Sequence, residues 1–258
     1  MVAPAIIKAV PALQQDLIDN ANYGYTNRSV GFMFGKRPAT VQNALVDLWE
    51  GPTDQYVFPT TGLQLSVVSS SASDTSNGTG IRQIIIDYLD TSYVEHTEIV
   101  TLAGLTPVAT VATNIFRING VHAVAVGSGG LAAGNISITN GGVTYGYIAI
   151  GETLARQAVF TIPAGMNGYL SHWQCSSGAS SGQHFTQVII RATCHLGVLY
   201  PGVFLPIDEI GTLNSNSAVN FPTPIRMPAT ADVKMAAISD AVNANVTALG
   251  AATGWLES

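Results

Sequence analysis

The stretch IRQIIIDYLDTSYVEHTEIVTL, residues Ile81–Leu102, contains one of the most apolar clusters in the chain. Its first half carries β-branched isoleucines in a run that favours a strand. Its second half alternates, with Glu95, Thr97 and Ile99 on one face and His96, Glu98 and Val100 on the other. The short segment Asp90–Ser92 between the halves is a compact turn. The stretch therefore predicts an antiparallel β-hairpin over 81–102.

The preceding segment, SSSASDTSNGTG at 69–80, consists of small polar residues with one charge. DTSNGTG at 74–80 offers oxygen ligands at alternate positions, as a calcium loop does. However, position twelve counted from Asp74 is Ile85, where such a loop needs a bidentate Glu. We therefore expect a long, neutral, exposed connection between a strand at 63–70 and the hairpin.

Short apolar segments separated by turn residues continue along the chain, and this pattern predicts an all-β protein. Turn signals such as GSGG, TNGG and SSGASSGQ separate short strands, which is typical of an antiparallel β-sandwich or jelly roll. A break near Gly151 predicts two packed sandwich units, over 56–150 and 151–258. Beyond the hairpin we expect strands at 63–70, 113–126, 135–139, 143–150, 157–162, 168–175, 185–200, 219–226 and 232–239.

Residues 1–55 differ in pattern, and they predict a mostly extended N-terminal arm with short helices. PALQQDLIDNA at 11–21 predicts one helix, and TVQNALVDLWEG at 40–51 predicts another, with Thr40 as N-cap. Between them, aromatic residues at 23, 25, 32 and 34 indicate an extended arm or an edge strand.

Composition excludes several classes of function. Only 10% of the 258 residues are charged against a usual ~25%, 47% are apolar, and the net charge is −6. No basic cluster exists beyond Lys36-Arg37, so we expect no direct nucleic-acid partner. The sequence contains no run of 18 apolar residues, so it predicts no membrane-spanning helix. The first residues lack a basic segment before their apolar part, so we expect no secretory signal there.

Two His and two Cys, in HWQC at 172–175 and CH at 194–195, have the residue types of a zinc site. If 168–175 and 185–195 pair as a hairpin, Cys175 and Cys194 lie roughly 30 Å apart at ~3.3 Å per residue. That register argues against a zinc site and against a disulfide. It predicts two buried or half-buried thiols instead.

Other titratable residues do not form a catalytic pattern. The pairs Asp87 with Asp90, Glu95 with Glu98 and Asp208 with Glu209 have odd spacings that place their members on opposite faces of a strand, and His96 has the same difficulty. His122 follows small apolar residues, where a packed histidine is more usual than a catalytic base. GSGG at 127–130 is not followed by the G-K-[ST] of a phosphate loop, so it predicts a glycine turn. We therefore assign no catalytic, cofactor-binding or metal-binding residues, and we expect a structural or binding protein and not an enzyme.

Several stretches together resemble virion structural proteins of tailed double-stranded DNA bacteriophages. They include SVVSSSASDTSNGTGIRQIIIDYLD, EHTEIVTLAGLTPV, GSGGLAAGNISITNGG and FPTPIRMPATADVKMAAIS, and the resemblance covers about residues 60–245. It implies a β-sandwich protein made in the bacterial cytoplasm and assembled on the virion, as a homotrimer on the capsid surface. The implied function is a capsid decoration or cement protein that binds the major capsid protein or another virion protein.

Three alternatives stay open. Tail, baseplate and fibre components, including receptor-binding tips, use the same sandwiches and trimers. A carbohydrate-binding module would need an aromatic platform, for which the chain offers Trp49, Trp173 and Trp255. The third alternative is a hydrolase whose site has no recognisable sequence pattern.

Overall fold

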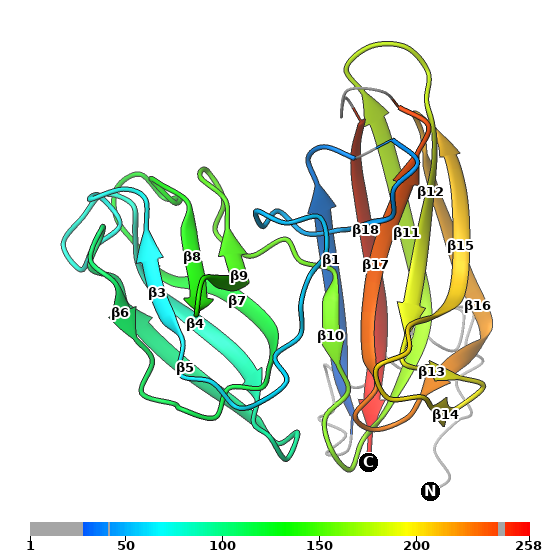
Figure 1. Cartoon of the computed structure of the whole chain (residues 1–258), viewed down its shortest axis with the longest axis horizontal. Coiled ribbons are helices and arrows are strands. Elements are labelled where there is room, and N and C mark those ends of the chain that lie inside the picture. The colour runs from blue at the N-terminus through cyan, green and yellow to red at the C-terminus, as the bar shows by residue number, and fades with distance from the viewer. Residues whose placement is uncertain (1–27, 41, 242–245) are drawn as a thin grey trace, which may run out of the picture.

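The computed structural model describes residues 28–40, 42–241 and 246–258 (Figure 1). Over these residues the regular structure consists of β-strands, which pair in antiparallel ladders, and it includes no helix. The all-β sandwich fold class is therefore confirmed. No described helix is long and apolar enough to cross a membrane. The predicted helix at 11–21 lies outside the described residues.

The helix predicted over 40–51 is wrong. Residues Val46–Asp47 form strand β2, which pairs with β17 (Asp232–Ser239). The buried Asp47 carboxylate fixes this segment, because its Oδ2 accepts hydrogen bonds from Lys234 Nζ at 2.7 Å and from the Tyr56 backbone N–H at 2.8 Å. These long-range contacts outweigh a helical preference worth only tenths of a kcal/mol per residue.

Eight strands form a jelly roll. In chain order they are β1 (Arg28–Arg37), β10 (Val159–Thr161), β11 (Asn167–Ala179), β12 (Phe185–Ala192), β15 (Leu205–Leu213), β16 (Asn216–Met227), β17 and β18 (Val246–Glu257). One sheet has the order β1-β18-β11-β16 and the other β10-β17-β12-β15, with β2 beside β17. All but one of the connections between successive strands of the eight therefore cross from one sheet to the other.

Strand β18 was not predicted, although it lies between β1 and β11 and alternates between buried and half-buried residues along its whole length. Its buried face consists largely of alanine and glycine, which carry little strand signal. Small residues are required there because the core is close: a Cβ on Gly250 would lie 2.6 Å from Met235 Sδ and 2.8 Å from Leu48 Cδ1. The strand at 205–213 was also not predicted.

Gly35, which pairs with Gly250 across β1 and β18, gives a test of this packing. A Cβ at Gly35 would lie 2.1 Å from the Leu48 carbonyl oxygen and 2.5 Å from Ala158 Cβ. We expect Gly35→Ala to lower the free energy of unfolding by about 3 kcal/mol, because backbone must move to admit the methyl group. Gly178→Ala on β11, where the added Cβ meets open space, is the control and should leave stability nearly unchanged in urea unfolding.

A second sandwich is inserted between the first and second strands of the jelly roll (Figure 1). It contains β3 (Ser66–Ser69), β4 (Ile81–Leu89), β5 (Glu95–Thr101), β6 (Val108–Ala109), β7 (Arg117–Val126), β8 (Ile136–Asn140) and β9 (Val143–Ile148). The sheets have the orders β6-β3-β8-β9 and β5-β4-β7. The predicted hairpin is confirmed as β4 and β5, and Ile81, Ile84 and Ile86 are fully buried between the two sheets.

The inserted sandwich and the jelly roll have separate hydrophobic cores. The strands β1 and β2, from the N-terminal region, belong to the sheets of the jelly roll. The domain boundaries expected near residues 55 and 150 stay predictions.

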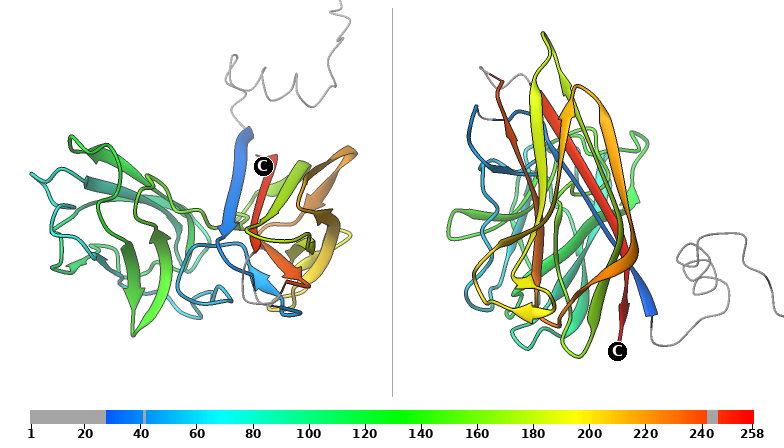
Figure 2. Two further views of the ribbon diagram at one scale, coloured as in Figure 1. Left: turned by 90° about the horizontal axis from the view of Figure 1, so that it is seen from above. Right: turned by 90° about the vertical axis from the view of Figure 1, so that its right-hand side faces the viewer.

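Arg117 on β7 joins the two lobes, which Figure 2 shows side by side. Its guanidinium donates from Nε and Nη2 to the two carboxylate oxygens of Asp232 on β17, at 2.8 and 3.0 Å. Nη1 donates to the Pro59 carbonyl oxygen at 2.8 Å, and the Phe116 ring centroid lies 4.0 Å from Cζ. Both side chains of the ion pair are nearly buried, with 8% and 11% of their surfaces exposed.

Asn119, two residues after Arg117 on β7, makes a second contact between the lobes. The Asn119 amide donates to the Thr161 carbonyl oxygen at 2.9 Å and accepts from the Thr161 backbone N–H at 2.8 Å. Thr161 Oγ1 also donates to Asp232 Oδ1 at 2.6 Å. Charged and polar groups of both lobes are thus satisfied by each other, which fixes the inserted sandwich on the jelly roll.

Candidate binding surfaces

The four residues considered as a zinc set lie in different environments. His172 Nδ1 is 2.8 Å from Asn220 Oδ1, and His195 is exposed on β13 (Cys194–His195). Cys175 and Cys194 are free and buried, and burial raises the pKa of each thiol to about 11. Among the residues that the structure describes, no three His, Cys, Asp or Glu side chains are grouped as metal ligands.

The register used to separate the two cysteines is wrong. Strand β11 pairs with β16 and β18, whereas β12 pairs with β15 and β17, so the loop between β11 and β12 crosses from one sheet to the other. The two strands are not a hairpin. Both thiols instead contribute to the one core of the jelly roll.

Three of the carboxylates that were considered as catalytic candidates accept hydrogen bonds that stabilise the fold. Asp90 accepts two backbone N–H bonds inside the hairpin turn. Glu98 accepts two from the backbone at 111–112, and Asp208 accepts one from the Trp173 indole at 2.9 Å. Asp90 Oδ2 also lies 3.0 Å from His96 Nε2, in a pair at the exposed end of the hairpin.

Asp74 in the DTSNGTG segment organises the serine-rich connection. Oδ1 accepts from the backbone N–H groups of Ile81 and Ala133, and Oδ2 accepts from Gly134 N–H and Ser69 Oγ, all at 2.6–3.0 Å. The side chain is fully buried. Its oxygens therefore serve protein donors, which disfavours the calcium interpretation.

Nearby, the glycines at 127–130 form backbone hydrogen bonds to residues 79 and 80 and not a phosphate cradle.

Asp87 and Glu95 form a carboxylate pair that the sequence spacing did not reveal, because it lies across two strands. They border a groove of about 310 Å³ on the outer face of sheet β5-β4-β7, together with His96, Thr97 and Asn119. Burial and the Asp87 charge raise the pKa of Glu95, and burial raises the pKa of Asp87 although His122 opposes it. Only the hairpin register brings the two carboxylates to one face.

The raised pKa values of these two carboxyl groups give a pH-dependent prediction for Asp87→Asn. A raised carboxyl pKa in the folded protein means that ionisation opposes folding as the pH rises above the usual carboxyl range. We expect Asp87→Asn to increase the free energy of unfolding at neutral pH and to lose that gain in acid, where both carboxyls are protonated in both states. Urea unfolding at several pH values measures this. A variant less stable than the wild type at neutral pH would contradict it.

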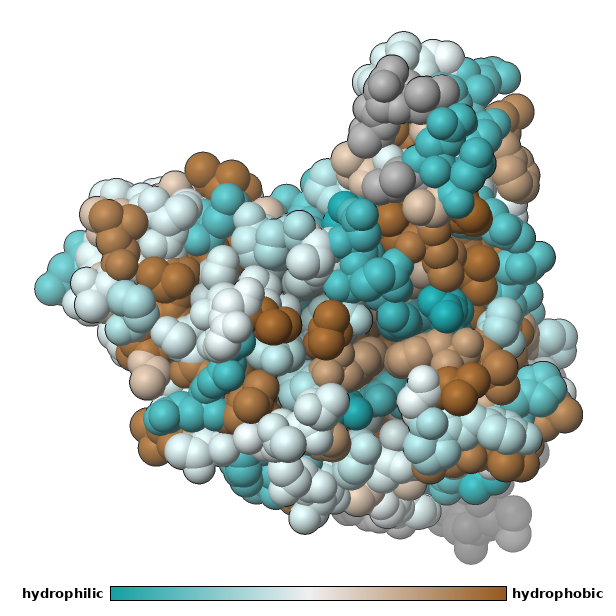
Figure 3. Space-filling view, in the orientation of Figure 1, coloured by the Kyte–Doolittle hydropathy of each residue, from teal (hydrophilic) through white to brown (hydrophobic). Residues whose placement is uncertain are grey.

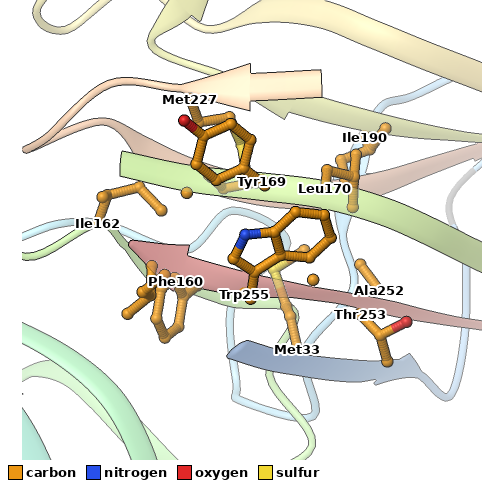
Figure 4. A pocket seen from close by; sticks show the side chains of 14 residues that line it. Met33, Phe160, Ile162, Tyr169, Leu170, Ile190, Met227, Ala252, Thr253 and Trp255 are labelled. Carbon is orange, nitrogen blue, oxygen red and sulfur yellow. The ribbon is translucent and has the colours of Figure 1, made fainter. Parts of the chain in front are cut away.

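An apolar pocket opens at one end of the jelly roll (Figure 4). Side chains of both sheets line it, among them Met33, Phe160, Leu170 and Met227. Its volume of about 50 Å³ is far below the ~300–1,000 Å³ typical of ligand sites. Its lining offers no carboxylate, imidazole or thiol, so the pocket supports no catalysis.

The tryptophans do not form a platform for sugar binding. Trp49 and Trp173 are 1% and 0% exposed, in the cores. Trp255 stacks on Tyr169 with ring centroids 5.3 Å apart.

The most exposed apolar group in the jelly roll lies on the hairpin of β13 and β14 (Val198–Leu199). His195 pairs with Val198, so Leu196 and Gly197 form a two-residue turn, and both have positive φ, 50° and 78°. A left-handed conformation costs a leucine of the order of 1–2 kcal/mol, whereas Asn-Gly suits this turn. Leu196 occupies this position despite that cost, and its side chain is 89% exposed.

Further large apolar side chains are exposed near this turn and on the inserted sandwich. Figure 3 shows hydrophobic surface on both lobes. Close to the turn these residues are Val198, Tyr200 and Val203, and on the inserted sandwich they include Val94, Ile99, Leu105 and Val111. Where such side chains form a contiguous patch, they are typical of protein–protein contacts.

No protein-family model matches the chain, and no curated protein matches it in sequence. Among solved structures, the chain is similar to that of infectious bursal disease virus Gt strain, with 9% identity over 93% of this chain and 77% of that chain and a TM-score of 0.18. For the Gx strain of the same virus the values are 9%, 94%, 82% and 0.21. For its VP2 subviral particle they are 9%, 89%, 72% and 0.18. TM-scores this low assign neither a family nor a function.

Proposed function

We propose that the chain is a non-enzymatic structural protein of a virus particle, and specifically a decoration or cement protein on the head of a tailed bacteriophage. The observation that carries this proposal is a jelly roll, an architecture found in viral capsid domains, in a chain that exposes large apolar side chains on both lobes. The resemblance in the sequence supports the phage context. The partners are then further copies of this chain, as a homotrimer, and the major capsid protein.

The chemistry of the surface favours protein contact over catalysis. The chain is only 10% charged, so much of its surface can be desolvated against another protein at little cost. Asp87 and Glu95 border a groove that His96 and Thr97 also line, and its lining includes no serine or cysteine.

Particles assembled with and without this chain test the proposal. We expect heads that lack it to lose resistance to heat or to a chelator, and we expect added purified protein to restore that resistance. Loss of adsorption with intact, equally stable heads would instead assign the chain to the tail, baseplate or fibre. Particles unchanged in both properties would contradict a structural role on the virion.

The N-terminal region offers a further partner contact within this proposal. Strand β1 is an edge strand, and residues 1–27 precede it, so they could add to a neighbouring sheet or bind the shell. Deletion of residues 2–27 retains β1 and should weaken binding to heads. Unchanged binding and unchanged oligomer size would remove this role from the N-terminus.

A further inference from the structure

The turn at Leu196 is built in a way that folding alone does not favour. A two-residue hairpin turn with positive φ at both positions suits Asn-Gly or Gly-Gly, and a β-branched or bulky residue there is strained. The chain nevertheless has Leu196 before Gly197, with 89% of the leucine exposed to solvent. Strain that places an apolar side chain in water indicates a contact that covers it.

A complementary surface lies on the outer face of sheet β5-β4-β7. The pairing register places Ile99, Ile85, His122 and Leu154 in one row across adjacent strands. We call these four residues the Ile99 row. Ile99 is 58% exposed and Leu154 is 38% exposed, although the solvent face of a sandwich sheet is normally polar.

The charges beside the two surfaces are opposite. Asp87 lies two residues from Ile85 on the same face, and Glu95 borders the same groove. At the hairpin, His195 is exposed, and a Cβ on Gly197 would lie 3.4 Å from Arg226 Nη1, so a guanidinium is next to the turn. A cation brought to the groove would relieve the repulsion between the two carboxylates.

We propose that the β13–β14 hairpin of one copy binds the Ile99 row of a second copy, with Leu196 as the apolar anchor and Arg226 facing Asp87 and Glu95. This inference gives a specific interface to the self-association included in the proposed function. The hairpin belongs to the jelly roll and the Ile99 row to the inserted sandwich, so the two surfaces lie on different lobes (Figure 1). Such a contact is head-to-tail, and it makes a ring such as a trimer if its rotation closes.

The variant Leu196→Asn separates docking from folding. It creates the Asn-Gly turn that this backbone favours, so thermal stability should be unchanged or higher. If Leu196 is an interface anchor, the association constant should fall by at least about tenfold in sedimentation equilibrium. Leu213→Asn removes another exposed leucine, at the end of β15, and should leave association unchanged.

The opposite surface and the charges are tested in the same assay. Ile99→Thr keeps a β-branched residue on β5 and should weaken association as Leu196→Asn does. Arg226→Gln should weaken it less, and the difference from wild type should shrink as salt is added, because charges at an open surface are screened.

Cross-linking tests the pairing directly. One population carries Leu196→Cys and the other Ile99→Cys; mixed under mild oxidation, they should form disulfide-linked dimers that neither population forms alone. The two natural cysteines are buried and should stay unreacted. A wild-type protein that remains monomeric at every accessible concentration, or a Leu196→Asn variant that associates like the wild type, would overturn the proposal.

These outcomes are distinct from failure of the proposed function. Monomers that still bind and stabilise heads would reject the hairpin contact and keep the decoration role. Head-to-tail oligomers of a protein that is absent from particles would do the reverse.

Discussion

Replacing Arg117 with alanine is expected to lower the free energy of unfolding by about 3–5 kcal/mol, because it leaves the Asp232 carboxylate nearly buried without its cation. The change also removes the guanidinium from the Phe116 ring and from the Pro59 carbonyl oxygen. Since this side chain joins the two lobes, we further expect the inserted sandwich to unfold before the jelly roll. Urea unfolding followed by circular dichroism, with limited proteolysis of the partly unfolded protein, measures both effects.

Arg226→Gln is the matched control, because Arg226 is exposed and donates to the Asn167 side-chain oxygen on the surface. At concentrations where the protein is monomeric, we expect its stability to stay within about 0.5 kcal/mol of the wild type. An Arg117→Ala protein as stable as this control would show that the ion pair does not hold the lobes together.

Asp74→Ala is the second large expected effect. The substitution leaves three backbone N–H groups and the Ser69 hydroxyl without their acceptor in a buried site. We expect a loss of about 3–5 kcal/mol, because each unsatisfied buried donor costs about 1–3 kcal/mol and the loop can relax only in part. Urea unfolding measures the loss.

The exposed neighbour Asn77 supplies the control, and Asn77→Ala should be nearly neutral. Calcium distinguishes the two interpretations of this segment. Because protein donors occupy both oxygens of Asp74, added Ca²⁺ should not raise the unfolding midpoint of the wild type. A midpoint that rises with Ca²⁺ in the wild type but not in Asp74→Ala would restore the calcium-loop hypothesis.

The parts of the fold that could be predicted are those with strong local signals. The isoleucine run and the compact turn at Asp90 define the β4–β5 hairpin because β-branched residues and turn residues act over a few positions. Strand β18 has no such signal, since its buried alanines and glycines are explained only by the side chains packed against them. The segment at 40–51 has a helical spacing of apolar residues, but pairing of β2 with β17 and the Asp47–Lys234 ion pair override it.

The candidate surfaces depend on tertiary structure for the same reason. Asp87 and Glu95 are brought to one face by cross-strand register, and no spacing within either strand reveals the pair. The register argument against a zinc site failed at its premise, because the SSGASSGQ loop connects opposite sheets and not neighbouring strands. For the hairpin at Leu196, the sequence HLGV contains a turn signal in Gly197, yet only the positive φ and the exposure identify Leu196 as unusual.

Cryo-electron microscopy of purified particles tests the central claim, a structural role on the head, most directly. The account predicts density on the outer surface of the capsid into which the jelly roll and the inserted sandwich fit as one rigid body, repeated around a symmetry axis. Purified particles whose heads lack such density, and in which this chain is not detected, would contradict it.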